Sequence, residues 1–171
     1  SEFTELVIDN MTATVLTAIV LTILVVLLFL AHLRQAAIIA LSIPVSFLMT
    51  FSLMYLAGID LNMVTMSAII LAIGLLVDDG IVVLENVHRH MTQRGKPPLR
   101  AAIDGTEEIF LADLSGTVTT IAVLIPLAFL GGFVGKLFGP LAWTLAFALS
   151  SSFLISVTLI PLLTALWLPP G

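Results

Sequence analysis

Five long apolar runs follow one another along the chain, and they constrain its fold more than any other feature. They occupy residues 11–33, 36–57, 63–88, 108–130 and 140–168. A helix that crosses ~30 Å of hydrocarbon needs about 20 mostly apolar residues. A membrane β-strand is much shorter and alternates in polarity, and these runs do not alternate. The sequence therefore predicts an all-α integral membrane protein, built as a bundle of five transmembrane helices.

Charge and cysteine content exclude several other classes of protein. Charged residues make up 10% of the chain, far below the ~25% of a soluble domain. The chain has no cysteine, which excludes a disulfide framework and a thiolate metal site. We expect no metal, no cofactor and no nucleic-acid partner; the lipid bilayer is the first partner that the composition implies.

The basic residues are divided unevenly between the two ends of the predicted bundle. Five of the six Lys and Arg residues fall in loops that share one side: Arg34, Arg89, Arg94, Lys96 and Arg100. The opposite side has Lys136 as its cation, among several acidic residues. Because Lys and Arg accumulate in cytoplasmic loops, we expect the N-terminus on the outer side and the C-terminus in the cytoplasm.

The loops are too short to form a separate extramembrane domain. Residues 1–171 are therefore expected to form a single transmembrane domain. In the loop between the third and fourth runs, Pro97 and Pro98 precede residues 99–103, a pattern that predicts a proline-started helical turn. We expect this short amphipathic segment to lie on the cytoplasmic membrane surface, between the third and fourth helices.

Two adjacent acidic residues, Asp78 and Asp79, interrupt the third run near its middle. A charged side chain at this depth costs roughly 2.5–3.5 kcal/mol on insertion scales. Burial and mutual repulsion both favour the protonated form of a carboxyl group, so one of the pair is expected to hold a proton near neutral pH. Such a pair suits a proton carrier, although a purely structural role in hydrogen bonding between helices is the alternative.

Further polar residues follow the acidic pair along the same run. Glu85 lies seven residues after Asp78 and hence on the same helix face, so Glu85 and Asn86 are candidates for a hydrated proton route. An interfacial ion pair between Glu85 and Arg89 is an equal alternative for Glu85. His88 and His90 are expected on a solvated interfacial face, because no carboxylate or further histidine is spaced with them as in a metal motif.

The segment that carries the acidic pair resembles a known family. Residues 71–87, LAIGLLVDDGIVVLENV, closely resemble the fourth transmembrane helix of resistance–nodulation–division (RND) multidrug efflux transporters. Residues 43–45, 58–66 and 125–132 resemble other segments of the same pumps. The resemblance covers essentially the whole chain, which is similar to transmembrane helices two to six of the N-terminal half of such a pump.

The resemblance implies a proton/drug antiporter of the bacterial inner membrane, in which Asp78 and Asp79 are the intramembrane proton carriers and protons are the coupling ion. It also implies a trimer that works with a periplasmic adaptor and an outer-membrane channel and exports amphiphilic, drug-like substrates. The family's periplasmic porter and docking domains have no counterpart here. Its essential Lys and Arg partners belong to the other half of the pump, so we expect this chain to be part of a longer protein and not to transport alone.

Two other classes remain as alternatives. An intramembrane aspartyl protease needs two aspartates that face each other, usually from different helices, whereas Asp78 and Asp79 share one run and Asp104 and Asp113 are expected near a membrane boundary. A non-transporting membrane interaction module, which assembles with itself or with a full-length pump, is the stronger alternative. In that case the acidic face of the third helix is its contact surface.

Overall fold

The computed structural model describes residues 2–30 and 33–167, which form five long helices and no strand. The helices are α1 (Glu2–Leu30), α2 (Leu33–Ala57), α3 (Met63–Thr92), α4 (Pro98–Ala128) and α5 (Gly132–Trp167). Each is long and apolar enough to cross a membrane. The predicted all-α membrane bundle is therefore confirmed.

Local sequence signals explain where the helices begin and end. Between α2 and α3, Gly58 has a φ of 75°, a conformation that glycine adopts without steric cost. Asn62 then caps α3: its side chain accepts hydrogen bonds from the backbone N–H of Val64 and Thr65, and the Thr65 hydroxyl accepts one from the Asn62 N–H. At the start of α4, Pro98 occupies the first turn, where a missing N–H costs nothing.

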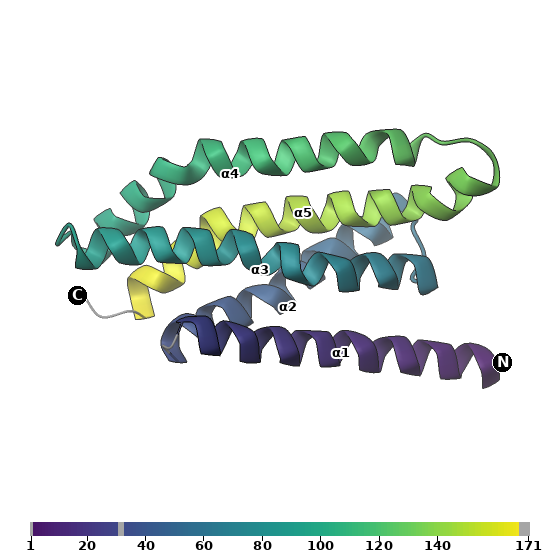
Figure 1. The fold of residues 1–171 in the computed structure, drawn as a ribbon, viewed down its shortest axis with the longest axis horizontal. Coiled ribbons are helices and arrows are strands. Elements are labelled where there is room, and N and C mark those ends of the chain that lie inside the picture. The colour runs from purple at the N-terminus through teal and green to yellow at the C-terminus, as the bar shows by residue number, and fades with distance from the viewer. Residues whose placement is uncertain (1, 31–32, 168–171) are drawn as a thin grey trace.

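Helices α3, α4 and α5 run side by side along the long axis of the molecule, and α3 contacts both α4 and α5 (Figure 1). Helix α2 packs chiefly against α5, and α1 lies at the periphery against α2 and α3. Helix α1 begins at one end of the molecule and α5 ends at the other, as an odd number of membrane crossings requires (Figure 1).

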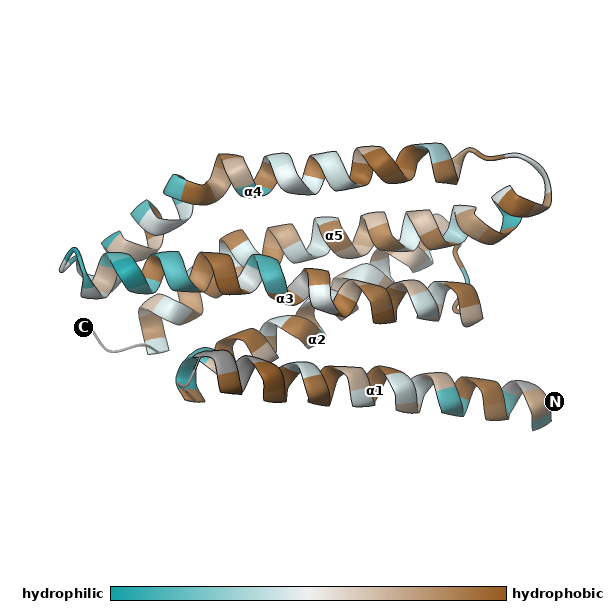
Figure 2. Ribbon diagram, in the orientation of Figure 1, coloured by the Kyte–Doolittle hydropathy of each residue, from teal (hydrophilic) through white to brown (hydrophobic). Residues whose placement is uncertain are grey.

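The interior is built from branched aliphatic residues of α2, α3 and α5, including Ile38, Ile39, Ile69, Ile73 and Ile160. Figure 2 shows that apolar colouring covers most of every helix. It is interrupted by a hydrophilic band near the middle of α3 and by hydrophilic residues around the α3–α4 connection. Apolar residues thus lie on the inward and the outward faces alike, as expected for helices in lipid.

Glycines allow the closest approaches between helices. A Cβ atom on Gly105 of α4 would lie 2.9 Å from the Cα of Val87 on α3, closer than such atoms pack. On α3, a Cβ on Gly80 would lie 3.0 Å from the Cδ1 of Ile39. Small residues at such contacts are typical of membrane helix packing.

Three predicted boundaries need correction. Helix α1 begins at Glu2 and not at residue 11. The proline-started segment at residues 99–103 is not a separate surface element, because it forms the first turns of a continuous α4. Helix α5 begins at Gly132, before the predicted start at residue 140. Residues 31 and 32 of the first predicted run, and residue 168 of the last, lie outside the described residues.

Candidate functional site

Asp79 is half-buried between three helices near the middle of α3. Its carboxyl group lies in hydrogen-bonding contact with that of Asp113 on α4. From α5, the Ser152 hydroxyl donates a hydrogen bond to the Oδ2 atom of Asp79 at 3.3 Å. Ser156, one turn further along α5, contacts the Asp113 carboxyl group. Two carboxyl groups and two hydroxyls from α3, α4 and α5 therefore form one polar site inside an apolar bundle.

Asp78 lies on a different face of α3. Its side chain is exposed, and it shares that face with Leu71, Leu75 and Val82, which are 63%, 40% and 49% exposed. Successive helix positions differ by about 100°, so the two aspartates cannot point in the same direction. Of the predicted pair, the fold brings Asp79 into the polar site and leaves Asp78 outside it.

Asp113 is the site residue that the sequence prediction missed. It was expected near a membrane boundary, but it lies inside α4, one helix away from Asp79. A signal for it exists in the sequence, since Asp113 is the one ionisable residue between positions 109 and 128. No family motif drew attention to it, and its partner on α3 becomes visible only when the helices are placed.

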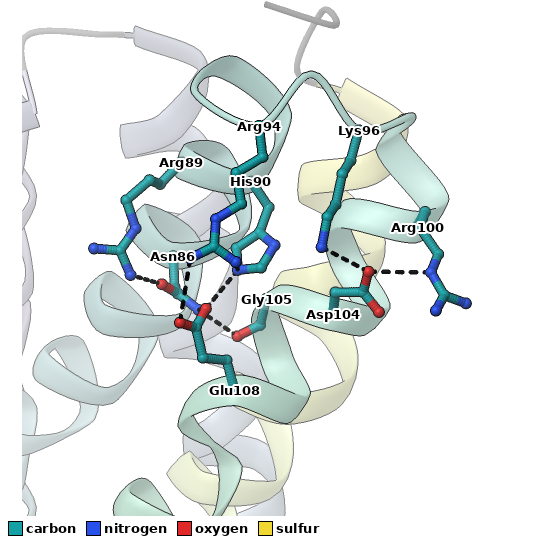
Figure 3. A network of polar contacts seen from close by, with 9 residues as sticks. All are labelled: Asn86, Arg89, His90, Arg94, Lys96, Arg100, Asp104, Gly105 and Glu108. Carbon is teal, nitrogen blue, oxygen red and sulfur yellow. Dashed lines mark hydrogen bonds and ion pairs between the residues drawn. The ribbon is translucent and has the colours of Figure 1, made fainter.

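A second group of polar contacts joins α3 to α4 at the end where the two helices are connected (Figure 3). The Asn86 amide donates to the Gly105 carbonyl at 2.6 Å and to the Glu108 Oε2 atom at 3.0 Å. The Arg89 guanidinium donates to the Asn86 Oδ1 atom. The His90 Nε2 atom lies 2.5 Å from the same Glu108 oxygen.

One expectation about this segment is wrong, and one of the two alternatives for Glu85 is not observed. His90 was expected on a solvated face, yet it is 2% exposed and packs between α3 and α4. Arg89 was considered as an ion-pair partner for Glu85, but its guanidinium hydrogen-bonds to Asn86. Glu85 itself is exposed, on the same face as Asp78, as the seven-residue spacing predicts.

Asp104 anchors the loop between α3 and α4. Its Oδ2 atom lies 2.8 Å from the Lys96 Nζ atom and 3.0 Å from the Arg100 Nε atom (Figure 3). Lys96 of the loop is thus held against the first turns of α4. This contact ties the loop to the end of the bundle.

A cavity of about 300 Å³ lies beside the cytoplasmic half of α3, next to α4. Its lining residues are Val82, Glu85, Asn86, Arg89 and Ile109. The two residues predicted to form a proton route, Glu85 and Asn86, therefore line the same cavity. The hydroxyls of Thr119 and Thr120 do not contribute to either group, because they bond to carbonyls of their own helix.

Five helices that are each long and apolar enough to cross a membrane, with carboxyl groups between them, define a multi-pass membrane protein. The sequence profile described as "AcrB/AcrD/AcrF family" matches residues 1–171. The chain therefore belongs to this family of RND multidrug transporters, as the resemblance implied.

Individual relatives agree with this assignment. The chain is 46% identical over 148 residues to the multidrug resistance protein MdtC of Pectobacterium atrosepticum, which covers 86% of the chain and 14% of that protein. It is 43% identical over 155 residues to MdtC of Escherichia coli K12, which covers 91% of the chain and 15% of that protein. The chain thus spans about one seventh of the length of these curated relatives.

Family membership also bears on the protease alternative. Asp79 and Asp113 lie close together on different helices. An aspartyl protease requires such an arrangement, and the sequence analysis did not predict it. The family is nevertheless one of transporters and not of catalytic enzymes. The facing carboxyl groups therefore need an explanation within transport.

Proposed function

We propose that this chain forms the transmembrane proton-translocating part of a proton/drug antiporter of the RND type, with Asp78 and Asp79 as its proton carriers. The observation that carries the proposal is the contact of the Asp79 carboxyl group with that of Asp113 inside the bundle. Two neighbouring carboxyl groups inside a bundle repel each other when both are ionised, which favours a proton on one of them. The site is therefore suited to bind and release a proton.

The two aspartates lie in different environments and are therefore expected to have different partners. Asp79 exchanges its proton within a site supported by the Ser152 hydroxyl. Asp78 lies on the exposed face of α3, where an ionised carboxylate in contact with lipid is costly. A cation on a helix outside this chain is the partner that suits it.

Such a cation also supplies the coupling step. When it binds the acidic face of α3 in one state and leaves it in another, protonation and helix position become linked, which is the two-state element that transport requires. The described spans contain no Lys or Arg at the level of Asp78. For this reason the chain alone is not expected to carry out transport.

Export of amphiphilic drugs, assembly into a trimer, and contact with a periplasmic adaptor and an outer-membrane channel belong to the same proposal. The relatives' printed name, multidrug resistance protein, supports drugs as the substrate class. Protons are the coupling ion, and no other cofactor is proposed.

Infrared spectroscopy of the chain in lipid tests the proton site. A protonated-carboxyl band is expected at neutral pH. In the variant Asp78→Asn/Asp79→Asn this band disappears or moves, because Asp113 loses the carboxyl partner with which it shares a proton. Asp60→Asn, which changes an exposed residue of the α2–α3 turn, serves as the matched control. A band that keeps its position and amplitude in the double variant refutes the proton-carrier roles.

The topology proposal places the N-terminus in the periplasm and the α3–α4 loop in the cytoplasm. Single cysteines at the exposed positions Asp60 and Gln93 test it, because the chain has no cysteine of its own. On spheroplasts, a membrane-impermeant thiol reagent should label position 60 and spare position 93. Labelling of position 93 but not of position 60 would contradict this orientation.

A further inference from the structure

A groove of about 340 Å³ runs between α4 and α5 at the end of the bundle that carries the α3–α4 loop. Residues of α4 from Leu99 to Phe110 form one wall, and residues of α5 from Val157 to Ala165 form the other. The α4 residues recur every three or four positions, so they form one stripe along the helix. The α3 contacts of α4 use Gly105, which is not part of this stripe. The groove therefore lies on another face of α4 from the one that packs against α3.

The groove is as deep as one leaflet of a bilayer. Leu99 and Phe110 are eleven residues apart, which is roughly 16 Å along a helix. Half of the ~30 Å hydrocarbon thickness is about the same length. At the deep end, Phe110 packs against Phe153 of α5 with ring centroids 5.5 Å apart, and this contact closes the groove. A single acyl chain from one leaflet matches this length.

The walls of the groove favour an acyl chain over another helix. Ala102 is 6% exposed at the base of the groove, whereas Leu99 and Leu162 project from it and are 69% and 53% exposed. Helices that pack against each other in membranes approach through small residues, as α4 approaches α3 at Gly105. Projecting leucines keep a helix away, while a flexible chain can lie between them.

Charged residues surround the mouth of the groove at the loop end. The Arg100 side chain is 67% exposed although its Nε atom donates to Asp104. Arg100 and Glu107 are seven residues apart and therefore lie on one side of α4; Glu107 also lines the groove. Lys96 bonds to the same Asp104 carboxylate (Figure 3). These two cations and two carboxylates leave the mouth without net charge, which suits a headgroup that is itself neutral but carries both signs of charge.

A buried hydroxyl group also lines the groove. Among the described residues, the Thr106 Oγ1 atom has no hydrogen-bond partner, although it is buried. By contrast, Thr119 and Thr120 of the same helix bond to backbone carbonyls. A hydroxyl in an apolar environment is costly without an acceptor. The ester carbonyl of a phospholipid is such an acceptor.

We propose that the α4–α5 groove binds one molecule of phosphatidylethanolamine from the leaflet at the α3–α4 loop, which is the cytoplasmic leaflet in the proposed topology. One acyl chain lies in the groove, and the Thr106 hydroxyl donates to an ester carbonyl. The Arg100 guanidinium donates to the phosphate, and the lipid ammonium donates to the Glu107 carboxylate. The site does not depend on the proton-carrier roles of the aspartates.

Lipid titration of the chain in detergent, read by native mass spectrometry, tests the headgroup. Phosphatidylethanolamine should bind about threefold or more tighter than phosphatidylcholine with the same acyl chains, because the quaternary ammonium of the latter has no N–H to donate. Glu107→Gln should remove most of this preference. Arg100→Gln should weaken the binding of both lipids about fivefold. Lys136→Gln, at the exposed outer end of α5, is the matched control and should bind as the original chain does.

A second pair of variants tests the position of the acyl chain. Ala165→Phe fills the groove and should weaken the binding of both lipids about fivefold or more. Leu166→Phe changes the next residue, which is exposed and does not line the groove, and should leave the affinities unchanged. Circular dichroism checks folding, and Arg100→Gln at its exposed position gives the answer if Ala165→Phe does not fold.

Three results would overturn the proposal. Equal affinity for the two lipids, or tighter binding of the anionic phosphatidylglycerol, contradicts the headgroup assignment. Lipid affinities that neither Ala165→Phe nor Arg100→Gln changes contradict the site. A dimer of the chain that Ala165→Phe abolishes, while lipid binding stays unchanged, assigns the groove to a second copy of the chain instead.

Discussion

Asp78 and Asp79 are neighbours in the chain, but they occupy contrasting surroundings. Asp79 meets Asp113 and the Ser152 hydroxyl inside the bundle, while Asp78 is exposed on a face that it shares with apolar side chains. The difference follows from the rotation of about 100° between successive helix positions. An adjacent pair of acids can therefore serve one site within its own bundle and a second partner outside it.

The same contrast extends along α3. The face that carries Asp79 also carries Asn86 and His90, whose polar atoms contact α4. The face that carries Asp78 also carries Glu85 and exposed apolar residues. We therefore regard the first as the inner face of α3, committed to this bundle, and the second as the outer face, available to another helix.

The largest expected loss of stability comes from a substitution that forces the inner face of α3 away from α4. Gly105→Ala places a methyl group 2.9 Å from the backbone of Val87, and overpacking of this kind costs about 1–3 kcal/mol. Gly116→Ala is the matched control, because nothing lies within 4 Å of its new Cβ atom and alanine favours a helix by about 1 kcal/mol. Unfolding in mixed micelles measures both variants, and equal stability would show that α3 and α4 do not pack as described.

An effect of similar or smaller size on the free energy of unfolding distinguishes the two aspartates. Asp79→Ala removes the partner of Asp113, which costs about 1–3 kcal/mol if the two carboxyl groups share a proton. Asp78→Ala, at the exposed position, should change the free energy of unfolding by less than about 0.5 kcal/mol. The same unfolding measurement applies. A gain in stability for Asp79→Ala would instead mean that both carboxyl groups are ionised and repel each other.

The smallest effect concerns the outer face. Because an acidic residue against lipid is costly, two or more copies of the chain should associate through this face in mild detergent. Asp78→Leu should weaken association by about 0.6 kcal/mol, or about threefold in the dissociation constant, the typical size of a polar contact between membrane helices. Asp9→Leu, at an exposed acid of α1, is the control. A mass measurement that finds only monomer at every concentration refutes the association.

If the chain is instead a membrane interaction module, association through the outer face of α3 is its main function. Its supporting observation is the exposed outer face of α3, with Asp78 and Glu85 among apolar residues. Proton exchange at the Asp79–Asp113 site separates the two proposals, because an interaction module has no need of a route from that site to the cytoplasm.

The sequence by itself determined the membrane class, the number of helices and the family. Hydrophobic length is a local property, since each helix satisfies its own backbone hydrogen bonds in lipid. The acidic pair was visible for the same reason: two carboxyl groups stand out in an apolar run wherever the neighbouring helices lie.

Which face of each helix points inward was decided only by the tertiary structure. In a soluble protein, apolar periodicity marks the buried face. Here the lipid-facing and the buried residues are both apolar, so the pattern cannot tell them apart. The contact of Asp79 with Asp113, the exposure of Asp78 and the burial of His90 against Glu108 therefore depend on how α3, α4 and α5 pack, because each joins residues that the sequence keeps apart.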